Sequence, residues 1–280
     1  MPTFDRAKLV KNLASDQILA PYLDKVFAYF DSPWTFDYAE KEIDDAWHPS
    51  GDCLPSVTEL YAKATNTGSH KAPSGGLRKA FMVGHFWHQL IQHIVVEELG
   101  FCTPDQIERR GYNWWGKVKP VLVDPASPNT AGLIPMPFSH DHPQGQPWAK
   151  PQPYHWVTGQ GDFAPLTAPN GWSGIVDIKT MNGTDYKKAS TSGLLPQRFE
   201  NKYVAQMNVY MQLFDQQQAM ILGVNKDSPH GFAEFTFLRD DELIDAIWAK
   251  WDFVSGCLDT GDTPTDEDDK AYALSFERTT

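Results

Sequence analysis

The chain has 280 residues, of which 41% are apolar, and this is enough apolar material for one large domain with a packed core. Its net charge of −12 argues against tight duplex binding through bulk positive charge. No apolar run reaches the ~18 residues of a membrane span, and the N-terminus lacks a basic-then-apolar leader. We therefore expect a cytoplasmic protein with no membrane partner.

The three cysteines, Cys53, Cys102 and Cys257, lie far apart and form no CxxC pair. This spacing indicates reduced thiols and gives no sign of a disulfide framework or of a zinc or iron–sulfur site.

Residues 1–70 are expected to form a helical region packed on the core. Residues 5–31 have helical character, with Ser15 or Asp16 as a candidate N-cap. Ser56-Val-Thr-Glu59 has the capping-box pattern, which predicts a short helix to about residue 65. A Gly- and Ser-rich connector then covers residues 68–76.

A longer helix is predicted over residues 77–99, and Gly100 can end it. The residues at helical spacing along it are Leu77, Phe81, Gly84, His88, Ile91 and Val95. Residues 101–153 are rich in proline and are expected to be a long loop insertion with one strand at 113–123.

The second half of the chain alternates strands and helices. Turn-forming residues at 164–171 separate two strand-like runs and predict a hairpin. The expected elements are strands at 157–163 and 171–180, a helix at 198–217, strands at 219–224 and 232–238, a helix from Asp240 or Asp241 to about 255, and an acidic tail at 261–280. We expect a mixed α/β fold, with a central mixed sheet flanked by helices and a core over residues 71–260.

Asp177 and Lys179 stand two apart in the second strand of this hairpin, so their side chains project from one face. The hairpin would bring Asp162, in the first strand, alongside Asp177. Two carboxylates and a lysine at the edge of a sheet are suited to bind a divalent metal and to activate a water, as the hydrolysis of a phosphodiester requires.

Two helical motifs extend this set. Gln206 and Tyr210 are four residues apart and share one helix face, and His88 lies one turn after Gly84. Basic residues gather in the sequence around the same elements, and we expect some of them to contact DNA. The candidates are Arg78, Lys187, Lys188, Arg198 and Lys202, with Trp172 as a stacking residue.

In this order, Gly84-x-x-x-His88, Gly159-x-x-Asp162, Asp177-x-Lys179 and Gln206-x-x-x-Tyr210 resemble the RecB-like branch of the PD-(D/E)XK nucleases. That branch includes nuclease domains of recombination and repair enzymes, CRISPR-adaptation exonucleases and phage exonucleases. The resemblance runs from about residue 78 to residue 210. It implies a core in αβββαβ order and Mg²⁺- or Mn²⁺-dependent hydrolysis of DNA.

The resemblance also implies roles for the residues. Asp162, Asp177, His88 and the Ile178 carbonyl would bind the metal, Lys179 would orient the water and stabilise charge, and Gln206 and Tyr210 would contact lysine, phosphate or base. The chain departs from the branch in two ways: Asp177 replaces the usual glutamate, and three scattered cysteines cannot bind the iron–sulfur cluster of some relatives. We expect no such cluster.

The function expected is a metal-dependent exonuclease that acts on DNA ends or single strands. A phage source would suit a chain without a GxxxxGK[ST] helicase motif. Two alternatives stay open at this point: an endonuclease on the same core, and a catalytically silent module that binds DNA or a partner.

Overall fold

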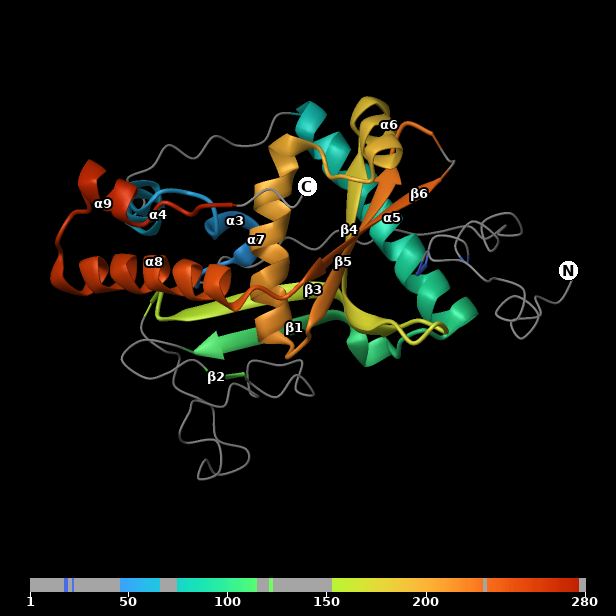
Figure 1. Cartoon of the computed structure of the whole chain (residues 1–280), viewed down its shortest axis with the longest axis horizontal. Coiled ribbons are helices and arrows are strands. Elements are labelled where there is room, and N and C mark those ends of the chain that lie inside the picture. The colour runs from blue at the N-terminus through green and yellow to red at the C-terminus, as the bar shows by residue number, and fades with distance from the viewer. Residues whose placement is uncertain are drawn as a thin grey trace, which may run out of the picture.

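A six-stranded mixed sheet forms the centre of the fold (Figure 1). The computed structural model describes residues 18, 19, 22, 46–65, 75–114, 121–122, 153–228 and 231–276, and it leaves the side chains of 75–82, 110–114, 121–122 and 197–198 undescribed. The strand order is β2–β1–β3–β4–β5–β6, in which β4 and β5 are parallel and the other neighbours are antiparallel. The strands are β1 Ile107–Trp114, β2 Val121–Leu122, β3 Trp156–Thr167, β4 Ser173–Met181, β5 Gln218–Asn225 and β6 Phe232–Leu238.

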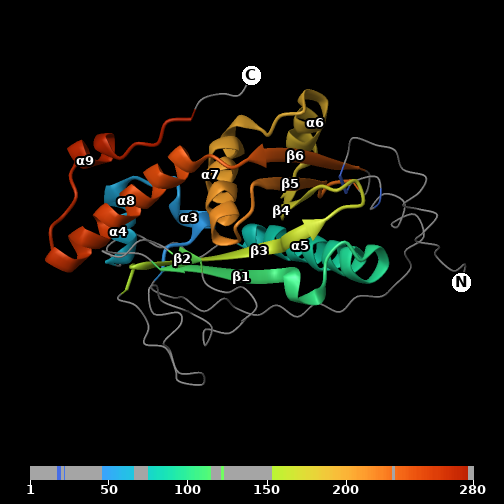
Figure 2. The ribbon, with the colours of Figure 1, turned by 60° about the horizontal axis from the view of Figure 1, so that its bottom comes forward.

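Helices cover both faces of this sheet (Figure 2). The long helix α5 (Gly75–His93), with a π-helical turn at Ile94–Leu99, packs on one face. The other face is covered by α7 (Gln197–Leu213), beyond which lies α8 (Asp241–Thr260). The shorter helices are α3 (Pro49–Asp52), α4 (Val57–Ala64), a 3₁₀ turn at Pro104–Gln106, α6 (Gly183–Ser192) and α9 (Asp266–Ala271).

This arrangement confirms the expected mixed α/β class. The elements α5, β1, β3, β4, α7 and β5 follow one another in αβββαβ order. Parallel neighbours such as β4 and β5 need a crossover, and α6 and α7 together supply it. The crossover sets the first turn of α7 at the carboxyl end of β4 (Figure 1).

Local capping signals are found where the sequence predicts them. Ser56 and Glu59 form both bonds of a capping box at the start of α4. The Asp240 side chain accepts a hydrogen bond from the Leu243 N–H and so caps α8. Gly100 ends the π-helical turn at φ 59°, a left-handed conformation that glycine adopts without strain. The predicted helix at 5–31 lies outside the described residues, apart from residues 18, 19 and 22.

Two predictions differ from the structure. The strand expected at 113–123 is wrong in its bounds, because β1 begins at Ile107 and pairs with β3 up to Trp114. Pairing with a long neighbour outweighs the weak local pattern of Glu108 and the two arginines that follow it. The tail expected from residue 261 contains α9, whose Asp269 carboxylate accepts bonds from the Thr58 N–H and hydroxyl.

The N-terminal region is joined to the core by buried polar contacts. The Lys250 ammonium on α8 donates to the carbonyls of Cys53 and Pro55, and the Trp251 indole donates to the Asp52 carbonyl. On the other side of the sheet, the Glu234 carboxylate on β6 accepts from the backbone N–H groups of Ile18 and Leu19, at 2.6 Å each. Across the described ranges, no helix combines the length and apolarity that crossing a membrane requires.

Candidate active site

The site forms where β3 and β4 separate. The two strands pair at Phe163 and Val176 but, within the described residues, not beyond this point on the side of Asp162 and Asp177. The Asp162 carboxylate occupies the gap, and its Oδ2 accepts a 2.7 Å hydrogen bond from the Ile178 N–H. The predicted hairpin is therefore confirmed, and it brings the two carboxylates to the point where the strands part.

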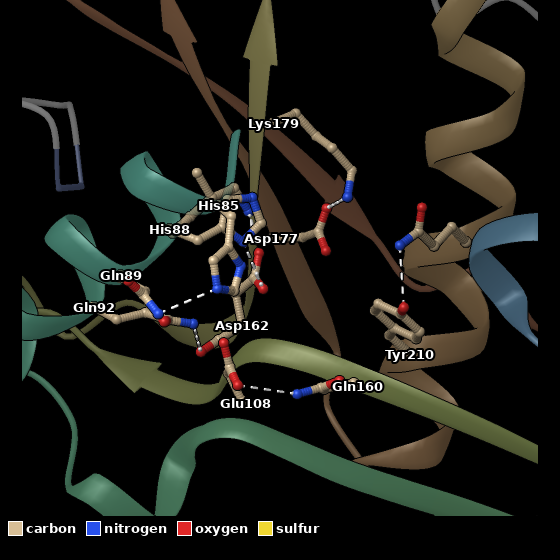
Figure 3. A network of polar contacts seen from close by, with 12 residues as sticks. His85, His88, Gln89, Gln92, Glu108, Gln160, Asp162, Asp177, Lys179 and Tyr210 are labelled. Carbon is tan, nitrogen blue, oxygen red and sulfur yellow. Dashed lines mark hydrogen bonds and ion pairs between the residues drawn. The ribbon is translucent and has the colours of Figure 1, made fainter. Parts of the chain in front are cut away.

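Asp162 is also held from the helix side. His88 on α5 donates from Nδ1 to Asp162 Oδ1 at 3.1 Å (Figure 3), so the histidine and the aspartate that the resemblance assigns to one metal lie together. Gly84 itself lies against β4: a Cβ there would be 3.5 Å from Thr180 Oγ1, an ordinary contact distance. The helix thus approaches the strand closely, although an alanine would fit at Gly84.

Asp177 and Lys179 form an ion pair on the β4 face opposite α5 (Figure 3). Asp177 is 2% exposed, and the Lys179 ammonium also lies 5.5 Å from the centre of the Tyr203 ring on α7. Asp177 Oδ2 is the atom that the Lys179 ammonium contacts. A carboxylate offers about four lone-pair sites, so Asp177 can bind a second cation beside Lys179.

The charges of the site depend on one another. Burial alone would raise the pKa of Asp162, but His88 and Lys179 outweigh burial and hold this pKa below its usual value. Burial, reinforced by the nearby Asp162 charge, raises the pKa of Asp177 despite Lys179. Burial would lower the pKa of Lys179, yet the two carboxylates raise it, so this lysine is a firm cation near neutral pH.

Gln206 and Tyr210 lie on one buried face of α7, and the Gln206 amide donates to the Tyr210 hydroxyl at 3.1 Å. Tyr210 is 4% exposed and packs against Gly159, so as placed it does not reach a phosphate or a base. Its position favours support of Gln206 over the expected DNA contact. Gln206 Oε1 is buried and has no hydrogen-bond partner in the described part of the chain.

A wider polar network surrounds Asp162, and sequence reasoning did not single it out. Gln92 donates to the Asp162 carbonyl at 3.5 Å, and Gln89 contacts His85 at 3.1 Å (Figure 3). Gln92 lies four residues after His88, so helical spacing could have found it. On the sheet, Gln160 donates to the Glu108 carboxylate at 3.3 Å.

The position of Glu108 follows from strand pairing. The register that pairs Ile107 with Phe163 and Arg109 with Gly161 sets Glu108 opposite Asp162. Glu108 has φ 46°, a conformation that is uncommon for a residue other than glycine. No local sequence signal reveals this arrangement, because it depends on the start of β1.

The DNA-contact candidates fall into three groups. Lys187 and Lys188 are exposed on α6, just past the carboxyl end of β4. Lys202 is exposed on α7 but lines a hollow of about 360 Å³ beside α3 and α4, and Trp172 packs on the apolar layer under α5. Arg78 and Arg198 stand in the first turns of α5 and α7, where their side chains lie outside the described residues.

The ligand atoms at the site are of the types that bind a hard divalent cation. Asp162 and Asp177 are buried carboxylates whose like charges oppose each other, and a hard cation bound by both would offset that repulsion. Within the described ranges, no three His, Cys, Asp or Glu side chains converge closely enough to hold a metal as they stand. His88 and Asp162 bond each other, and the Ile178 N–H donates to Asp162.

No protein-family model matches the sequence, and no curated protein matches it. Among solved structures, a protein named SSO0001 is 10% identical, with 81% of this chain and 82% of that one covered at a TM-score of 0.40. The alkaline exonuclease LHK-Exo from Laribacter hongkongensis is 15% identical, with 78% of this chain and 90% of that one covered at a TM-score of 0.41. The structure of LHK-Exo in complex with dAMP also matches. A phage-related exonuclease from Haemophilus somnus is 22% identical, with 38% of this chain and 56% of that one covered at a TM-score of 0.27. The TM-scores are low, so we take neither family nor activity from these likenesses.

Proposed function

We propose that this protein is a divalent-metal-dependent DNA nuclease that hydrolyses phosphodiester bonds at the separation of β3 and β4. The observation that carries the proposal is the meeting of Asp162, Asp177 and Lys179 there, with both carboxylates buried. The order of these residues along the chain also resembles that of the RecB-like PD-(D/E)XK nucleases. If Asp177 and Lys179 formed only a structural salt bridge, the position of Asp162 between two strands that stop pairing would have no explanation.

The charge of each side chain indicates its role in the proposed reaction. Asp162, Asp177 and His88 would hold Mg²⁺ or Mn²⁺, which when bound would lower the pKa of a bound water and neutralise phosphate charge. Lys179 remains protonated, so it stabilises negative charge that develops on the phosphoryl oxygens and orients the attacking water. Tyr210 holds the Gln206 amide through its hydroxyl, and the free Gln206 Oε1 is available to accept from that water or from Lys179.

We further propose that cleavage proceeds from DNA ends or along single strands, in recombination, repair or phage DNA processing. This part rests on the resemblance of the motifs. The Lys179 side chain is 21% exposed and His88 is 25% exposed, so substrate can reach the site from solvent. The geometry of the site alone does not require a free end.

The experiment is cleavage of linear and covalently closed circular DNA, single- and double-stranded, in Mg²⁺, Mn²⁺ or EDTA. We expect metal-dependent loss of the linear forms, with the circles intact. Cutting of circles would replace the exonuclease by an endonuclease on the same site. If no form is cut in either metal, the nuclease proposal is wrong.

A further inference from the structure

Helix α6 presents a polar, basic outer face beside the candidate site. Thr184, Lys187, Lys188 and Thr191 are exposed, and their spacing of three, four and seven residues places them on one side of the helix. They line an open hollow of about 630 Å³ together with Gly183 and Ser192. The inner side of the same helix is apolar, with Ala189 buried in the core and Tyr186 packed against it.

These side chains are available to a ligand. Within the described part of the chain, neither the two ammonium groups nor the two threonine hydroxyls make a hydrogen bond or an ion pair. The nearby carboxylates bond neutral groups: Asp185 accepts from the Asn182 amide, and Asp227 accepts from the Gly183 N–H at 2.7 Å. Neither forms an ion pair with Lys187 or Lys188, so both ammonium groups can bind an anion in a protein whose net charge is −12.

The position of the face relates it to the cleavage site. Only Asn182 separates the end of β4 from α6, and Lys179 lies two residues before β4 ends. The first turn of α7 reaches the same end of the sheet, whereas the acidic helices α8 and α9 extend away from it (Figure 1). A strand that leaves the site past Lys179 would thus meet α6 rather than the acidic part of the protein.

We infer that this face of α6 binds the phosphodiester backbone of the DNA strand that continues beyond the scissile bond. The inference rests on the proposed function and adds to it a second, non-catalytic contact surface. Thr184 and Thr191 lie about 10 Å apart along the helix axis at 1.5 Å per residue, which matches about three nucleotide steps of about 3.4 Å. Ammonium groups and hydroxyls are phosphate ligands that carry no base preference, so binding is independent of sequence.

The test is the salt dependence of single-stranded DNA binding, measured by fluorescence anisotropy of a labelled oligothymidylate in EDTA, where a metal-dependent nuclease cannot cut. Removing two phosphate contacts in Lys187→Gln/Lys188→Gln should reduce the slope of log K against log salt by about 1.4, at roughly 0.7 per charge on a single strand. In cleavage assays the same variant should raise KM and leave kcat within about twofold.

Two controls separate local contacts from general charge. Lys187→Arg/Lys188→Arg keeps both charges and should keep the slope, and Lys270→Gln on the remote helix α9 should not change it. An unchanged slope in the double glutamine variant, or an equal loss per charge in Lys270→Gln, overturns the inference while leaving the nuclease proposal intact. Failure of the wild-type protein to cut DNA refutes the proposed function instead, and the binding slope still decides whether α6 contacts the strand.

Discussion

Gly159 on β3 leaves the space that the Tyr210 ring occupies. A Cβ built at Gly159 would lie 2.7 Å from Tyr210 Cε1, 3.1 Å from Cδ1 and 2.8 Å from Leu213 Cδ1. The leucine methyl can rotate away, but the ring is buried and its hydroxyl is bonded to Gln206. Reaching an ordinary contact of 3.4 Å from 2.7 Å requires a shift of about 0.7 Å. Gly159→Ala must therefore displace the ring or the whole of α7.

Overpacking of this kind costs typically about 1–3 kcal/mol, and we expect Gly159→Ala to lower the free energy of unfolding in urea by this amount. Because Gln206 moves with Tyr210, kcat should also fall in the cleavage assay. Gly84→Ala is the matched control: its Cβ meets Thr180 Oγ1 at 3.5 Å, and alanine in a helix is favoured over glycine by about 1 kcal/mol. If Gly159→Ala is as stable and as active as Gly84→Ala, the packing of α7 on Gly159 is not as described.

Three further perturbations test other parts of the structure. Burial lowers the pKa of Lys250 from 10.5 to about 8. Between these two pH values the unfolded state binds more protons than the folded state. The free energy of unfolding should therefore rise by about 3 kcal/mol as the pH increases across this window. Subtracting the pH profile of Lys250→Met from that of wild type isolates this rise, and a flat difference curve would contradict it. Glu234→Ala leaves the Ile18 and Leu19 N–H groups without their acceptor and should cost about 1–3 kcal/mol in urea unfolding, whereas the exposed Glu97→Ala should cost nothing measurable. Mn²⁺ should raise the Tm of wild type but not of Asp162→Asn, because a ligand that binds the folded state stabilises it. Equal Tm shifts in the two proteins would show that Asp162 is not a metal ligand.

The core of the site was predictable because its signals are local. Asp177 and Lys179 alternate with apolar residues in a strand, and turn-forming residues at 164–171 return the chain so that Asp162 meets them. His88 was predicted from the Gly84-x-x-x-His88 motif of the family resemblance. The prediction did not include the separation of β3 and β4, which lets the Asp162 carboxylate replace a strand partner of Ile178.

The remaining features depend on packing between distant segments. Tyr210 was expected to contact DNA, and only the position of Gly159 under its ring shows that the tyrosine is buried. Glu108 joins the network through the register of β1, whose start local propensity did not locate. Lys250 is buried only because α8 packs on the N-terminal region.

The most direct test of the account is the single-turnover rate at which Lys179→Ala cleaves end-labelled linear DNA in Mg²⁺, compared with wild type and with the exposed-lysine control Lys270→Ala. Loss of a positioned charge that stabilises the transition state should lower the rate by about 10²-fold or more, with DNA affinity changed little and Lys270→Ala unaffected. A Lys179→Ala protein that cleaves at the wild-type rate would contradict the central claim that Asp162, Asp177 and Lys179 form the catalytic site.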